Sequence, residues 1–218
     1  MTVVSSPAAD TIRPGTASGS GASHRLTRPD LPLLVVVTGP PASGKTTLAS
    51  AIARELRLPL ITKDGLKETL FDALGTGDRD WSRRLGRASI ELMFTVLAGQ
   101  LAAGLPIVAE ANFWRSYDSA RFRSLPPHRV IQLLVTAPRA LLLERYRERV
   151  RHPGHLGASV VPEMEIALAA GEWTSLELGG ELIELEASSA IDLEPLIVRI
   201  QALLAVSIGN RPEEARFD

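Results

Sequence analysis

Eight consecutive residues, from Gly39 to Thr46, have the types and spacing needed to bind a chain of phosphates. They read Gly-Pro-Pro-Ala-Ser-Gly-Lys-Thr and match the pattern G-x-x-x-x-G-K-[ST] at every defined position. Glycine lets the backbone curl so that successive N–H groups point at phosphate oxygens. Lys45 would then reach the β- and γ-phosphates, and the Thr46 hydroxyl would bind Mg²⁺. The alternative is an ordinary Gly/Pro turn with one surface lysine.

The sequence around this loop favours phosphate binding over a plain turn. Before the loop, residues 33–38 form a short apolar run rich in valine, which is typical of a strand buried on both faces. After it, residues 46–56 place Leu48, Ile52 and Leu56 on one helical stripe. We therefore predict that the loop binds ATP and Mg²⁺ through Gly39, Pro40, Pro41, Ala42, Ser43, Gly44, Lys45, Thr46 and Thr47.

The rest of the chain continues the alternation of strand and helix. Further strands are predicted at 58–62, 105–109, 129–136 and 181–186, and helices at 65–74, 80–103, 116–124, from 139 onward, 162–170 and 192–206. Mostly apolar strands separated by helices predict a five-stranded parallel sheet covered on both faces, a three-layer α/β/α fold. Residues 1–30 contain 19 Ala, Gly, Ser, Thr or Pro residues and few large apolar ones, so we expect a disordered tail there and a second flexible tail at 209–218.

Over residues 33–205 the chain resembles the small P-loop kinases, which phosphorylate a hydroxyl of a small molecule or of a nucleic-acid end. Chloramphenicol phosphotransferase, gluconate kinase, polynucleotide kinase and the zeta toxins belong to this group. The resemblance depends on the phosphate loop, an Asp after the second strand, an acidic residue ending the third strand and an arginine-rich lid. It implies a P-loop NTPase fold over residues 31–208, with a helical lid at about 139–161.

Asp64 follows the second predicted strand, at the carboxyl edge of the sheet where open α/β folds bind their ligands. Phosphate transfer to an alcohol needs a carboxylate that orients the hydroxyl and accepts its proton. The resemblance also implies this catalytic role for Asp64. The simpler alternative is that Asp64 only caps the helix that begins after it.

The third strand ends at a similar place and adds candidate ligands for the substrate. Glu110 would bind Mg²⁺ through water or hold a substrate hydroxyl. Asn112 and Arg115, with two aromatic residues between them, form a mixed polar and aromatic segment suited to a polar substrate. The alternative is a solvated turn whose aromatic rings pack in the core.

The segment after Pro138 is rich in arginine. If it stays helical to residue 151, Arg145 and Arg149 share a face beside Tyr146 and Val150. In the kinases that the chain resembles, the lid supplies arginines to the transferring phosphate. We assign that catalytic role to Arg145 and Arg149 and expect Arg151 to contact the substrate. The alternative is a salt-bridged surface helix.

Two histidines and one serine are weaker candidates. His152 and His155 lack the further ligands of a zinc site, so we expect substrate or lid contacts, with an unspecialised polar loop as the alternative. The resemblance places Ser188, after the fifth strand, near the adenine.

Composition narrows the choice of partners and compartment. The formal net charge is −1 and there is no cysteine, so the composition disfavours charge-driven binding to nucleic acid and excludes cysteine-based metal or thiol chemistry. Without a secretory signal or an apolar run of about 20 residues, we expect a cytoplasmic protein with no membrane contact. Only three lysines (Lys45, Lys63 and Lys67) occur beside 21 arginines.

The long predicted helix at 80–103 also carries arginines. Leu85, Leu92, Met93, Val96 and Leu97 are placed for the core, whereas Arg83, Arg84 and Arg87 are expected in solvent, with the helix start facing the acceptor as the alternative.

These features predict an ATP-dependent phosphotransferase that acts on a hydroxyl of a small molecule such as an antibiotic or other metabolite, a nucleoside or a sugar. Two alternatives in the same class are a zeta-toxin-like nucleotide-sugar kinase and a nucleic-acid 5′-hydroxyl kinase. From other classes, an ATPase switch without an acceptor or a nonenzymatic nucleotide-binding module remains open. The third strand ends in a single Glu, not the Asp-Glu pair of motor ATPases, which disfavours the switch. The sequence does not indicate an oligomeric state.

Overall fold

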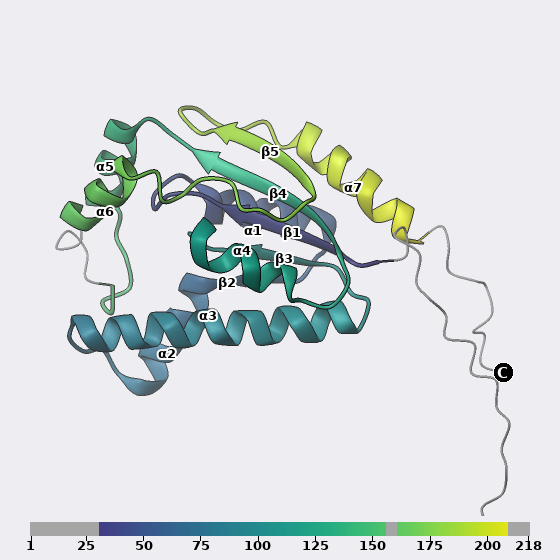
Figure 1. The fold of residues 1–218 in the computed structure, drawn as a ribbon. Helices are drawn as coiled ribbons and strands as arrows, with labels where there is room; N and C mark the ends of the chain where they lie inside the picture. Colours follow the sequence, from purple (N-terminus) through teal and green to yellow (C-terminus); the bar gives the residue numbers. More distant parts are fainter. Residues whose placement is uncertain (1–30, 156–160, 209–218) are drawn as a thin grey trace, which may run out of the picture.

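Five parallel strands form the centre of the molecule (Figure 1). The computed structural model describes residues 31–155 and 161–208; the tails expected at 1–30 and 209–218 lie outside them. The strands are β1 (Leu33–Thr38), β2 (Leu60–Thr62), β3 (Ile107–Glu110), β4 (Arg129–Thr136) and β5 (Glu181–Glu186). Their order across the sheet is β2-β3-β1-β4-β5, and every neighbouring pair is parallel. The predicted five-stranded parallel sheet is confirmed.

Each face of the sheet has its own layer of helices, because the side chains of a strand alternate between the two faces. Leu33, Val35 and Val37 pack against α1 (Lys45–Leu56) and α7 (Glu194–Ile208). Leu34 and Val36 face the opposite layer, built by α3 (Arg79–Ala102) and α4 (Arg115–Arg123). This arrangement confirms the three-layer α/β/α fold.

The pairing of β1, β3 and β2 sets which residues share a level at the carboxyl edge of the sheet. Glu110, the last residue of β3, pairs with Val37 on one side and with Thr62 on the other. Val37 lies two residues before Gly39, and Thr62 lies two residues before Asp64. The sheet therefore places the phosphate loop, Glu110 and Asp64 around one point.

Two short helices, α5 (Arg139–Glu148) and α6 (Val161–Ala169), stand over the carboxyl ends of the strands (Figure 1). They pack on each other through a separate apolar cluster that includes Leu142, Tyr146 and Met164. The helical spacing assumed for the residues after Glu148 is wrong. The helix ends at Glu148, and Val150, which was placed beside Tyr146 on an apolar stripe, is 96% exposed.

The helix α3 follows α2 (Lys63–Leu74) and packs against it and against the sheet. Leu85, Met93 and Leu97 are buried as predicted, but Leu92 and Val96 are 44% and 42% exposed. The apolar stripe of α3 is thus wider than the surface that covers it. No helix among those described has the length and apolar character of a membrane-spanning segment.

Two glycines in regular surroundings give a matched test of this packing. A Cβ on Gly180 would lie 2.2 Å from the Val130 carbonyl oxygen, whereas a Cβ on Gly99, in α3, would meet nothing within 4 Å. We expect Gly180→Ala to lower the free energy of unfolding by about 1–3 kcal/mol through overpacking. Gly99→Ala should raise it by about 1 kcal/mol, because alanine favours helix. Urea denaturation monitored by circular dichroism measures both, and equal effects of the two substitutions would contradict the strand placement.

Candidate active site

The loop between β1 and α1 has a backbone that fits the phosphate-binding motif. Gly39 and Gly44 adopt φ values of 144° and 90°, and Ala42 has a φ of 64°. A Cβ on Gly39 would lie 2.0 Å from the Val135 carbonyl oxygen, so only glycine is compatible with this close approach to β4. The predicted curl of the loop is therefore present.

Several polar groups of this loop have no protein partner. Gly44, which precedes α1, offers no side chain to cap the first N–H groups of the helix. The hydroxyls of Ser43 and Thr38 are buried and make no hydrogen bond within the described residues. Uncapped N–H groups at a helix N-terminus together with a buried unpaired hydroxyl suit an anionic ligand.

Lys45 and Glu110 form the buried charged centre of the site. The Lys45 Nζ lies 3.8 Å from Glu110 Oε1 and donates a hydrogen bond to the Pro40 carbonyl oxygen at 3.2 Å. Burial lowers the pKa of Lys45, and Glu110 only partly offsets this effect. Burial likewise raises the pKa of Glu110, against the opposing charge of Lys45 and a hydrogen bond from the Thr46 side chain. A phosphate beside this pair would supply the negative charge that favours the protonated lysine.

Asp64 lies in the first turn of α2 and does not cap it. The cap is Thr62, whose hydroxyl accepts a hydrogen bond from the Gly65 N–H at 3.1 Å, so the capping alternative for Asp64 is wrong. The Asp64 carboxylate instead lies 3.1 Å from Lys63 Nζ and 2.8 Å from an Arg151 nitrogen. Burial acts to raise the pKa of Asp64, but these cations and His155 outweigh it and hold the pKa well below its usual range. Asp64 is therefore ionised and positioned at neutral pH.

A cavity of about 700 Å³ brings several of the candidate residues together. The predicted site residues on its wall are Pro41, Lys45, Asp64, Asn112, Arg149, Arg151 and His155. A second hollow of about 270 Å³ lies beside the phosphate loop and is lined by Arg145 and Arg149 together with Ala42, Gly44, Lys45, Thr46 and Thr47. Arg145 and Arg149 thus share a hollow although the helix ends before Arg149.

Three candidates lie elsewhere. Arg115 pairs with Glu177 at 2.6 Å and lines a separate surface hollow. Ser188 lies two residues after the end of β5, is exposed and donates a hydrogen bond to the Glu186 carboxylate. His152 pairs with Asp72 at 3.0 Å and is not part of the cavity wall. In the 112–115 segment, Trp114 lines the cavity, whereas Phe113 is fully buried in the core.

The sequence prediction missed a wall of the cavity that α2 and α3 build. It contains Lys67, Ser82, Arg83, Gly86 and Arg87. Arg83, Arg84 and Arg87 are exposed, as expected, but Arg83 and Arg87 also line the cavity, as the alternative allowed, whereas Arg84 lies 5.0 Å from the Trp81 ring. One signal could have identified part of this wall, because all three lysines of the chain line the cavity.

Residues 151–155 attach the segment after α5 to α2. Asp64, Glu68 and Asp72 are spaced by four residues and so share one face of α2. Arg151 pairs with Asp64, His155 with Glu68 at 2.9 Å and His152 with Asp72. The His152 ring also stacks on Phe71. The His155 ring meets the same Phe71 ring edge-on. Residues 151–155 and the helix that carries Asp64 are therefore joined by three polar contacts and two ring contacts.

The oxygen ligands present fit Mg²⁺ better than a transition metal. Within the described residues, no group of three His, Cys, Asp or Glu side chains could hold a metal ion. The Thr46 hydroxyl and the Glu110 carboxylate meet at the phosphate loop. Mg²⁺ commonly uses one or two such oxygens and completes its shell with water and phosphate.

The parallel sheet, the loop conformation and the buried lysine define a P-loop nucleotide-binding fold of the small kinase type. Residues 34–169 match the AAA_33 family, described as an AAA domain, and because this match spans more than half of the sequence, the chain belongs to that family. The resemblance to small P-loop kinases is confirmed at this level.

Solved structures agree with this assignment. The chain is 36% identical to a candidate kinase from Chloroflexus aurantiacus J-10-fl, with a TM-score of 0.74 over 79% of this chain and 98% of that one. It shares its fold with a sugar kinase from Janibacter sp. HTCC2649, at 22% identity and a TM-score of 0.53 over 82% and 97% of the two chains. No curated protein matches significantly.

The contact between Gly154 and Phe71 provides a test of the lid attachment. A Cβ on Gly154 would lie 2.3 Å from the Phe71 ring, so Gly154→Ala must displace residues 151–155 from α2. We expect the His155 amide, which donates to the His152 carbonyl at 2.9 Å, to exchange its hydrogen at least about tenfold faster, the effect of losing about 1.4 kcal/mol of local stability. Hydrogen exchange with mass spectrometry measures this rate. Gly99→Ala is the control, and unchanged exchange in Gly154→Ala would refute the attachment.

Proposed function

We propose that the protein transfers the γ-phosphate of Mg·ATP to a hydroxyl of a small molecule. The observation that carries this proposal is that the ionised Asp64 carboxylate opens into the same cavity as Lys45 of the phosphate loop. A phosphate donor and a proton acceptor around one cavity are what transfer to an alcohol requires. The kinase description of the 36% identical relative also supports it.

In this proposal the loop N–H groups, Lys45 and Thr46 hold the phosphates. Thr46 and Glu110 would hold Mg²⁺, whose positive charge would offset the charge of the phosphate oxygens. Asp64 accepts a hydrogen bond from the acceptor hydroxyl and takes its proton as the oxygen bonds to the γ-phosphorus. The bond from that phosphorus to the β-γ bridging oxygen breaks, which leaves ADP and a phosphate ester. The low pKa of Asp64 keeps the carboxylate unprotonated, so it can accept the hydrogen bond of the hydroxyl, and it favours release of the transferred proton to solvent afterwards.

The lid arginines have separate roles in this proposal. Arg145 and Arg149 line the hollow beside the loop, where guanidinium groups would stabilise charge on the transferring phosphate. Arg151 is bound to Asp64 and therefore positions that carboxylate. Residues Asn112 and His155 reach the acceptor region of the cavity. Because the donor is ATP, we assign the activity to the cytoplasm.

Substitution of the two central residues tests the proposal. Lys45→Ala should abolish nucleotide binding or transfer, because the phosphates lose their buried cation. Asp64→Asn should keep ATP affinity while transfer falls roughly 100- to 10,000-fold, the usual contribution of a general base. Isothermal titration with Mg·ATP and mass spectrometry of acceptor mixtures after ATP treatment measure the two quantities.

Asp192→Asn is the matched control, because Asp192 lies in an exposed turn after β5 and its side chain accepts a hydrogen bond that asparagine can also accept. Full transfer by Asp64→Asn would contradict the role of this residue. Release of free phosphate without a phosphorylated acceptor would favour an ATPase switch over a kinase.

A further inference from the structure

Lys67 is a buried cation that forms no ion pair with any described residue. Its Nζ donates a hydrogen bond to the Ser82 hydroxyl at 2.8 Å and lies 5.2 Å from the centre of the Phe71 ring. Both partners are neutral, and within the described part of the chain no carboxylate lies within ion-pair distance of Lys67. Burial lowers the pKa of this ammonium to about 8. A buried ammonium without a negative partner is unfavourable, so the site is electrostatically incomplete.

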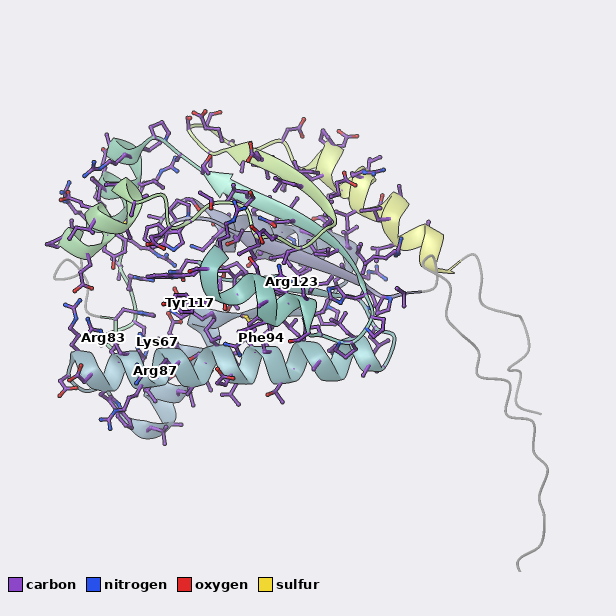
Figure 2. The ribbon with its side chains drawn as sticks, viewed as in Figure 1. Lys67, Arg83, Arg87, Phe94, Tyr117 and Arg123 are labelled. Carbon is purple, nitrogen blue, oxygen red and sulfur yellow. The ribbon has the colours of Figure 1, made fainter. Side chains whose placement is uncertain are left out.

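The wall around Lys67 is open to the cavity and basic. Gly86 of α3 leaves space beside the lysine, since even a Cβ there would remain 3.9 Å from Nζ. Arg83 and Arg87 flank Gly86 on α3 and also line the cavity. Figure 2 shows Lys67, Arg83 and Arg87 gathered at one end of α3. A ligand group that enters here meets several positive charges at once.

The carboxylates of the cavity cannot neutralise this wall. Among the described residues that line the cavity, nine are lysine or arginine and only three are aspartate or glutamate. Asp64 pairs with Lys63 and Arg151, Glu91 with Arg121, and Glu163 with Arg79 and Arg83. Lys67 and Arg87 have no ion pair among the described residues. A negatively charged ligand group in the cavity would compensate these charges.

The position of Lys67 relative to Asp64 indicates that the negative charge at Lys67 would come from the acceptor and not from the nucleotide phosphates. The two residues are three apart on α2 and so lie on one face, with their Cβ atoms about 5–6 Å apart. The phosphate loop has its own cations in Lys45, Arg145 and Arg149. An acceptor whose hydroxyl meets Asp64 would therefore present its next group to Lys67.

We propose that Lys67, with Arg83 and Arg87, forms an anion subsite, and that the acceptor of the proposed phosphate transfer is a small hydroxyl compound bearing a carboxylate or phosphate. The identity of the acceptor depends on the proposed function, but the anion subsite can be tested without it. A neutral polyol would leave Lys67 uncompensated and should bind more weakly, because discrimination is strong where a buried polar group loses its partner.

Binding of matched anionic and neutral compounds tests the subsite. The probes are D-gluconate against D-glucitol, and D-glucose 6-phosphate against D-glucose, titrated calorimetrically into the full chain with Mg·ADP present. We expect at least one anion to bind at least tenfold more tightly than its neutral partner, and the pair that responds distinguishes carboxylate from phosphate.

Lys67→Met should abolish this preference, whereas Lys67→Arg should retain part of it. Arg84→Gln, which removes a charge from α3 outside the cavity, should leave the preference unchanged.

Three outcomes would overturn the subsite: no binding of either anion, equal binding of anion and neutral partner, or an unchanged preference in Lys67→Met. Lys45→Ala separates the subsite from the proposed function. This variant should lose nucleotide binding and keep the anion preference measured without nucleotide. A wild-type protein that fails to bind Mg·ATP but prefers the anion would refute the kinase proposal alone.

The pH dependence of anion binding gives a second measurement. The groups that face Lys67 are Lys63 and Asp64 on α2, Arg83 and Arg87 on α3, and Arg151 and His155 on the lid segment. Deprotonation of Lys67 should lower the anion association constant above about pH 8, approaching tenfold per pH unit. His155 titrates below this range, because burial lowers its pKa. In Lys67→Arg the decline should disappear, since arginine stays charged, and an identical decline in that variant would exclude Lys67 as its source.

Discussion

A buried ammonium and a buried carboxylate at the centre of the sheet set the geometry of the site. Lys45 and Glu110 are both costly to bury, and each is tolerated beside the other because β1 and β3 pair in one register. These strands are buried on both faces, so a shift of one residue would turn apolar side chains to the wrong layer. Packing of the core therefore fixes where the charges meet. Thr62 of β2 pairs with Glu110 at the same level of the sheet. Because Thr62 caps the start of α2, it also sets the position of Asp64 in the first turn of that helix.

Much of the fold could be predicted because the strands are apolar and the helices are amphipathic. The bounds of β1, β4 and β5 follow from runs with strand-forming residues between turn signals. The end of α5 could not be predicted, because Tyr146 and Val150 have helical spacing in the sequence. The chain nevertheless leaves the helix at Arg149, two residues before Arg151, which forms an ion pair with Asp64. Periodicity also does not show which part of a wide apolar stripe other elements cover. On α3, Leu92 and Val96 belong to the stripe but are exposed.

The candidate site was predictable where a motif specifies backbone and side chain together, as in the phosphate loop. It was less predictable where contacts come from distant segments. Arg115 follows Asn112 by three residues, yet Glu177, 62 residues away, pairs with it outside the cavity. Lys67 has the sequence surroundings of an ordinary helical surface lysine, and only the packing of α3 at Ser82 and Gly86 makes it part of the wall. The use of lysine at three positions among many arginines was the available signal.

That restricted use of lysine also has a chemical consequence. Every side-chain amine of the protein opens into one cavity, so a reagent that acylates amines can modify only this cavity and the α-amino group. Among the three, Lys67 donates its hydrogen bond to a neutral hydroxyl, and its pKa of about 8 leaves more of it as free amine near neutral pH than in an ordinary lysine. An acylating group attached to a cavity ligand would therefore have an accessible nucleophile at a defined position, which makes this protein suited to covalent labelling.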